Sequence, residues 1–291
     1  DPSLGLPPEA APPPRPAALL RWDEVPEDFV ECFILSGYRR LHCSAQECLA
    51  SVLQPTNETL NFWTHFIPLL LFLSRFGQLL LLRGAGDVPF HHPALLPLWC
   101  YASGVLLTFA MSCTAHLFSC LSPRLRAAFF YLDYASISYY GFASTVAYSY
   151  YLLPGLSLLD AGAMSRYVQH MACPIMLESL LFDLRTRNPT LFVYFYRRYF
   201  WLLVAAFFNV SKIPERIQPG LFDIVGHSHQ LFHIFTFLSI YDQVHYVEDG
   251  LAEFLKAPLA APTYLGTVGY MLLLTLCLAV VVRRFLKTLV Q

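Results

Sequence analysis

Six apolar segments, each long enough to cross a lipid bilayer, constrain the fold of this chain more than any other feature. They cover residues 62–82, 95–118, 127–153, 190–210, 222–244 and 264–282. A helix of about 20 apolar residues spans the hydrocarbon core, and in lipid only helices and closed barrels pair all their backbone groups. We therefore expect an all-α, polytopic transmembrane bundle with about six spans.

The composition favours the same class. Of the 291 residues 56% are hydrophobic and only 13% are charged, whereas a soluble domain carries about 25% charged residues. The net charge of −1 and the lack of a basic stripe give no indication of nucleic-acid binding. The eight cysteines lack metal-finger spacing and are interpreted as inert thiols.

The chain divides into three regions. Residues 1–20 hold seven prolines in the first sixteen positions, which predicts a disordered tail. Residues 21–61 mix apolar residues with charged clusters, and we expect one or two short amphipathic helices there, at the membrane surface. Residues 62–287 hold the transmembrane helices.

Basic residues in the connecting loops predict the orientation. They fall after the second apolar segment, before the fifth and after the last: Arg124, Arg126, Lys212, Arg216, Arg283, Arg284 and Lys287. The positive-inside rule places all three groups in the cytosol, together with the N-terminus. Four arginines between the third and fourth segments or inside the fourth then fall on the outer side, which counts against the scheme: Arg185, Arg187, Arg197 and Arg198.

Residues 154–189 are less apolar than the six segments and carry scattered charges. Under this orientation it must cross the membrane an even number of times. Two crossings need about 40 residues and a turn, and this stretch is shorter. We therefore predict that it does not cross.

Histidines and a carboxylate lie near the predicted cytosolic ends of three spans. His229 and His233 are four residues apart, so both imidazoles share one helix face. That spacing alone fits a zinc site or polar contacts between helices equally well. Ser112 and His116 show the same spacing in the second span, and Asp133 lies early in the third.

Three imidazoles and a carboxylate at similar depth suit a zinc ion with a fourth position open to water. The Asp133 carboxylate could bind the metal directly or hold its water. Zinc lowers the pKa of bound water to about 7 and polarises a carbonyl, which is the chemistry of amide hydrolysis. A purely structural zinc, or a polar network without metal, is the alternative.

Other polar positions have plainer interpretations. Residues 57–65 form a polar group around the start of the first span, for which helix capping and hydrogen bonds between helices are expected. His227 points off the face of His229 and His233. Asn57 and Asn209 begin glycosylation sequons, but the predicted topology leaves both without glycan. Numerous tyrosines suit helix packing first, and a flat apolar ligand second.

Several motifs in order carry a family resemblance. They are Asn57-Glu58-Thr59-x-Asn61-x-Trp63-Thr64-His65, Ser112-x-x-x-His116, Leu132-Asp133-Tyr134, Ile213-Pro214-Glu215-Arg216 and Ser228-His229-Gln230-x-x-His233. From about residue 20 onward the chain resembles the progestin and adipoQ receptor family, and within it the progestin-receptor branch. The resemblance implies seven core helices plus one, zinc ligands at His116, His229 and His233, Asp133 as the acid that holds water, and Ser112 beside the metal.

Two functions follow from the resemblance. One is a multi-pass receptor of the plasma membrane that binds progesterone or related neurosteroids and acts through heterotrimeric G proteins. The other is a zinc-dependent hydrolase of a sphingolipid amide, like a ceramidase, with Asp133 and Ser112 as catalytic residues. A third hypothesis is a structural or interfering membrane protein that retains the site without activity.

The chain departs from the family pattern after residue 153. Two full spans are expected there, and the sequence near 167–171 looks like the junction of a deletion that removed the fourth helix and the start of the fifth. All the residues of the implied metal site are retained.

Overall fold

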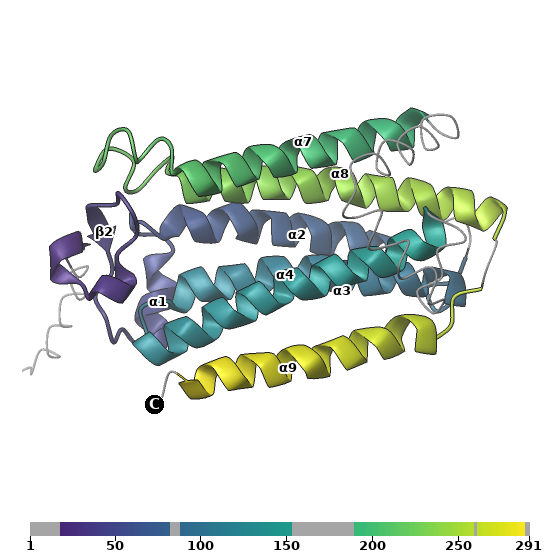
Figure 1. The fold of residues 1–291 in the computed structure, drawn as a ribbon, viewed down its shortest axis with the longest axis horizontal. Helices are drawn as coiled ribbons and strands as arrows, with labels where there is room; N and C mark the ends of the chain where they lie inside the picture. Colours follow the sequence, from purple (N-terminus) through teal and green to yellow (C-terminus); the bar gives the residue numbers. More distant parts are fainter. Residues whose placement is uncertain (1–17, 82–87, 153–188, 259–260, 289–291) are drawn as a thin grey trace, which may run out of the picture.

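The computed structural model describes residues 18–81, 88–152, 189–258 and 261–288, and in these ranges six long helices form one bundle (Figure 1). Their bounds are α2 Thr59–Leu81, α3 Leu96–Phe118, α4 Pro123–Tyr151, α7 Pro189–Ser211, α8 Ser228–Lys256 and α9 Tyr270–Thr288. Consecutive helices pack together in the pairs α2–α3, α3–α4 and α7–α8. Helix α8 also packs against α2 and α4, and α9 packs against α4. The predicted all-α bundle is confirmed.

Hydropathy alone singles out three of these helical stretches as membrane spans: Pro93–Phe118, Pro189–Ser211 and Leu265–Thr288. Helices α2, α4 and α8 have 23, 29 and 29 residues. At about 1.5 Å per residue each is longer than the hydrocarbon core is thick. Their lower hydropathy has a physical reason, because polar side chains such as His65, Asp133 and Gln243 are buried inside the bundle.

The predicted start of the fifth span at residue 222 is wrong. Helix α8 begins six residues later, at Ser228, and turns occupy the chain before it. Gly220 and Gly226 both have a φ of +90°, a backbone conformation open to glycine and unsuited to a continuous helix. The Gln230 side chain closes the turn, because it accepts a hydrogen bond from the Gly226 N–H and donates one to the Ile224 carbonyl.

The last span also differs at its ends from the predicted range 264–282. It opens with a short π-helix, Leu265–Gly269, and α9 then continues to Thr288.

The region before α2 covers one end of the bundle (Figure 1). It holds the short helix α1, Ala45–Ser51, which begins with a reciprocal Ser44–Glu47 capping box. Two strands, β1 Leu20–Arg21 and β2 Ser36–Tyr38, pair antiparallel, and two 3₁₀ turns, Trp22–Glu24 and Glu27–Phe29, lie between them. The sequence did not predict these strands, which are too short for a period-two pattern.

The same end of the bundle holds the start of α2, the α3–α4 and α7–α8 connections and the end of α9 (Figure 1). The three basic groups used to predict the orientation therefore lie together. Helix α4 ends and α7 begins at the opposite end. The prediction that residues 154–189 do not cross falls almost entirely on residues outside the described ranges. Which end faces the cytosol stays a prediction.

Candidate metal centre

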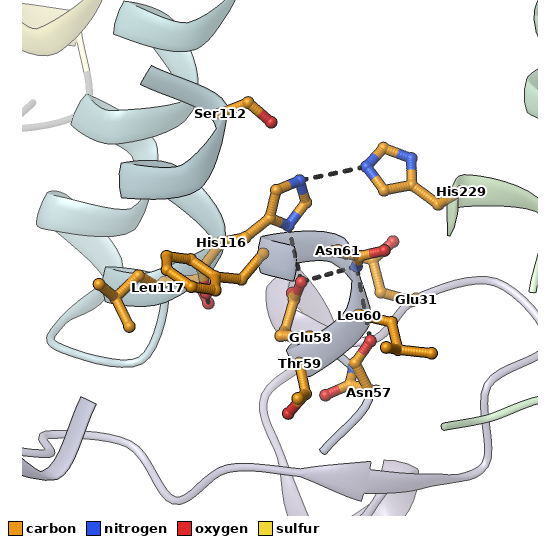
Figure 2. Close-up of polar contacts among 12 residues, drawn as sticks. Glu31, Asn57, Glu58, Thr59, Leu60, Asn61, Ser112, His116, Leu117 and His229 are labelled. Atoms are coloured by element: carbon orange, nitrogen blue, oxygen red, sulfur yellow. Dashed lines mark hydrogen bonds and ion pairs between the residues drawn. The ribbon is translucent and has the colours of Figure 1, made fainter. Parts of the chain in front are cut away.

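Three histidines converge at the end of the bundle that the N-terminal region covers. His116 lies in the last turn of α3, and His229 and His233 lie in the first two turns of α8. One ring nitrogen from each lies within 4.8 Å of the others, so the group could hold a metal ion. The Nε2 atoms of His116 and His229 face each other at 3.3 Å (Figure 2).

The His116–His229 pair has the spacing that zinc requires. A tetrahedral zinc ion at its usual distance from imidazole nitrogen holds two such nitrogens about 3.3 Å apart, which matches the His116–His229 separation. The other ring nitrogens are engaged: His116 Nδ1 lies 2.7 Å from a Glu58 carboxylate oxygen, and His233 Nδ1 lies 3.1 Å from the Asn61 carbonyl. Histidines that bind metals commonly donate their second N–H to a carboxylate or a backbone carbonyl. The lone pairs of His116 and His233 are thereby left on Nε2.

The sequence did not predict that Glu58 contacts a histidine of this centre. Its carboxylate is buried, with the residue 7% exposed, and it accepts hydrogen bonds from His116 Nδ1 and Asn61 Nδ2 (Figure 2). In the sequence Glu58 belongs to the polar group 57–65, for which helix capping and hydrogen bonds between helices are expected. A carboxylate at the same depth as three histidines was the signal that could have pointed to this contact.

A second pair of polar side chains lies one turn deeper in the bundle. His65 Nδ1 contacts Ser112 Oγ at 2.7 Å, and the His65 ring stacks on His233 with the centroids 3.7 Å apart. The Ser112 hydroxyl is therefore engaged by His65 and lies a turn away from His116 along α3 (Figure 2). His65 Nε2 and Asn61 Oδ1 are buried without a hydrogen-bond partner, so both are free for a bound water.

Asp133 is buried on α4 but is not a member of the histidine cluster. Among the residues that the structure describes, none forms a hydrogen bond or an ion pair with its carboxylate. The two roles left open by the sequence are direct coordination and the holding of a water, and both stay predictions.

Arg39 joins the N-terminal region to the end of α3. Its guanidinium donates hydrogen bonds to the carbonyls of His116 and Leu117, at 2.6 and 2.7 Å. A cation that satisfies the last carbonyls of a helix is also favoured by the helix dipole. The backbone that carries His116 is thus fixed from outside the bundle. In the sequence, Arg39 stood out only as part of a charged cluster.

A cavity of about 280 Å³ reaches the histidines from this end of the bundle. Its walls come from the N-terminal region, the starts of α2, α4 and α8, and the α7–α8 connection, and they include Glu58, His116 and His229. His227 also lines it, and its Nε2 lies 3.2 Å from the Asn57 carbonyl. Burial lowers the pKa of His227, so this imidazole is neutral at pH 7.

The pattern of the haemolysin-III-related family matches residues 53–165 and 167–244, which together are well over half of the chain. The chain belongs to this family. It is the family of progestin and adipoQ receptors that the motifs predicted. The break between the two matched segments falls beside the predicted deletion junction.

Curated relatives cover most of the chain. Membrane progestin receptor delta of Homo sapiens is 36% identical, over 79% of this chain and 78% of its own length. Membrane progestin receptor gamma of Mus musculus is 31% identical, over 78% of this chain and 79% of its own. Membrane progestin receptor alpha of Sus scrofa is 28% identical, over 93% of this chain and 89% of its own length. The chain is therefore a multi-pass membrane protein; a special likeness to the epsilon receptor, which the motifs also suggest, stays a prediction.

Proposed function

We propose that this protein is a receptor of the plasma membrane that binds progesterone or a related neurosteroid and signals through a heterotrimeric G protein. The similarity to membrane progestin receptors over about four fifths of the chain carries this proposal. The bundle offers suitable surroundings for a flat apolar ligand, because buried aromatic side chains line the contacts between α3, α4 and α8.

The proposal includes a zinc ion bound by His116, His229 and His233. Zinc would supply Lewis-acid chemistry and a bound water of lowered pKa. The chain's own residues prepare the site: Glu58 and the Asn61 carbonyl fix the ring orientations of His116 and His233. Asp133, buried on the neighbouring helix, would hold a water or a proton near them.

A zinc-dependent hydrolase of a lipid amide such as ceramide is the alternative. The observation in its favour is the cavity lined by His116 and His229, two of the three clustered histidines, with Asp133 buried on the neighbouring helix α4. In this function Asp133 accepts a proton from the attacking water, and Ser112 is a polar neighbour that helps to position the substrate. Such general-base assistance contributes a factor of about 10² to 10⁴.

One experiment separates the two functions. The purified protein is reconstituted into lipid vesicles, and saturable binding of radiolabelled progesterone and release of sphingosine from ceramide are measured for wild type and Asp133→Ala. Progesterone binding that persists in Asp133→Ala, together with steroid-stimulated nucleotide exchange on an added G protein, supports the receptor. Sphingosine release that is lost in Asp133→Ala supports the hydrolase. If wild type does neither, both proposals fail.

A further inference from the structure

The connection between α7 and α8 carries apolar side chains on its outside and ionisable side chains on its inside. The apolar side chains of Ile217, Leu221 and Val225 are 68%, 67% and 62% exposed. The acidic residues Glu215 and Asp223 are only 2% and 3% exposed. A loop that is surrounded by water shows the opposite arrangement, with its charges outside. The pattern therefore favours surroundings other than water.

Hydrogen bonds inside the protein hold the two buried carboxylates in place. Glu215 accepts hydrogen bonds from the Ser228 N–H, at 2.7 Å, and from the Ser228 hydroxyl. Asp223 accepts them from the Leu35 N–H, at 3.1 Å, and from the Ser36 hydroxyl, at 2.7 Å. The connection is thus fixed both to the start of α8 and to the N-terminal region. It cannot turn its apolar side chains inward without breaking these bonds.

The exposed apolar surface of the connection continues that of α7. Helix α7 packs against α8, and its exposed face carries large apolar side chains at helical spacing: Phe200, Leu203, Phe207 and Val210. With 23 residues, α7 is about 35 Å long, so its end reaches the border of a hydrocarbon core of about 30 Å. Figure 1 shows the connection extending beyond the ends of α7 and α8. It therefore lies where the acyl chains meet the headgroups.

A cation lies beside the first exposed apolar side chain of the connection. Arg216 directly precedes Ile217 and is exposed. At a membrane interface an arginine keeps its guanidinium in the polar layer, where it matches the geometry of a phosphate. The end of the bundle that holds the connection is the predicted cytosolic end, and the cytosolic leaflet carries the anionic phospholipids. The charge of Arg216 is complementary to this leaflet.

We propose that the α7–α8 connection docks into the membrane leaflet at this end of the bundle. Its three exposed apolar side chains lie among the acyl chains, and Arg216 contacts the headgroup of an anionic phospholipid. The inference goes beyond the proposed function, because it applies to a receptor and to a hydrolase alike. Since Glu215 holds Ser228, the residue before His229, this lipid contact also sets the position of a histidine of the metal centre.

A tryptophan in the connection reports its surroundings directly. Leu221→Trp protein is reconstituted into vesicles that contain phosphatidylcholine or phosphatidylserine brominated in the acyl chains, and wild type supplies the background of its four tryptophans. Bromine quenches a tryptophan that contacts acyl chains, and iodide, present on both sides, quenches one that faces water. Gln46→Trp is the matched control, at an exposed position of α1 at the same end of the bundle.

We expect brominated lipid to quench Leu221→Trp and iodide to leave it unchanged, with the reverse result for Gln46→Trp. Brominated phosphatidylserine should quench Leu221→Trp at a mole fraction about fivefold lower than brominated phosphatidylcholine, the effect of one basic residue near an anionic surface. Adding Arg216→Gln should remove this preference. Adding Arg40→Gln should keep it, because Arg40 is an exposed arginine that pairs with Glu47 at 3.7 Å.

Three results would overturn the inference. Quenching of Leu221→Trp by iodide and not by brominated lipid would place the connection in water and leave its apolar surface to a cytosolic protein. Equal quenching by the two brominated lipids would reject the anionic headgroup as the partner. A preference for phosphatidylserine that survives Arg216→Gln would reject the role of this arginine. Because the assay measures neither steroid binding nor sphingosine release, each of these failures is distinguishable from a failure of the proposed function.

Discussion

The contact between Glu58 and His116 shows how single side chains prepare the metal centre. A carboxylate at the Nδ1 side, 2.7 Å away, fixes the tautomer with the lone pair on Nε2, where His229 lies. The contact also makes the imidazole a stronger metal ligand. At this scale the function of a histidine depends on a partner that is 58 residues away in the chain.

Replacement Glu58→Gln keeps the side-chain shape and removes the charge. Because outer partners of metal-binding histidines contribute about 10- to 100-fold in affinity, we expect zinc to be lost at a correspondingly lower chelator concentration. The measurement is zinc retention of the purified protein during titration with a chelator. Glu31→Gln is the control, since Glu31 pairs with Arg126. Equal chelator midpoints for the two variants would contradict the role of Glu58.

The sequence predicted some of these residues and not others, for a physical reason. His229 and His233 are recognisable because their spacing alone puts them on one helix face. Glu58 and His65 were seen only as members of a polar segment, because their contacts with His116 and Ser112 exist only after α2 and α3 have packed.

At the scale of the elements, the apolar segments of the sequence, read by length and charge, predicted all six described long helices but misplaced where α8 begins. Phe222 and Val225 are apolar and therefore extended the predicted span, although they lie in a bend and a turn. The apolar content of a segment does not reveal its backbone conformation. The positive φ of Gly226 therefore could not be recognised from the hydropathy of the surrounding residues. The correction places His229 in the first turn of α8 instead of well inside it.

The crossing of α3 and α4 supplies a prediction about helix packing. A Cβ atom at Gly104 would lie 2.9 Å from Ala143 Cβ and 3.0 Å from Tyr140 Cα, both closer than normal contact. Gly104→Val should therefore force the helices apart and destabilise the bundle, by about 1 to 3 kcal/mol. Thermal unfolding in detergent measures this as a lower midpoint.

Gly141 on α4 is the matched control. A Cβ atom there meets nothing within 4 Å, and alanine favours a helix more than glycine does. Gly141→Ala should leave the unfolding midpoint unchanged or raise it. A midpoint for Gly104→Val that equals that of wild type would show that α3 and α4 do not pack as closely as described.

At the scale of the whole molecule, the arrangement of the helix ends predicts a topology. The N-terminal region, the α3–α4 connection and the α7–α8 connection lie at one end (Figure 1), where the basic residues also gather, and the positive-inside rule makes this end cytosolic. Accessibility tags after residues 121 and 217 should be protected in sealed cells, and a tag after residue 258 should be labelled from outside. Labelling of the tag after residue 217 from outside would reject the orientation. Asn57 and Asn209 should carry no glycan.

The account depends most directly on the metal content of the purified protein. We expect about one zinc per chain by elemental analysis, retained in Asp133→Ala, which leaves the three histidines intact, and lost in His229→Ala, which removes one of the facing nitrogens. Zinc at that stoichiometry, and its loss in His229→Ala alone, is the predicted result. Folded wild-type protein that purifies without zinc, or a His229→Ala variant that retains it, would contradict the metal centre.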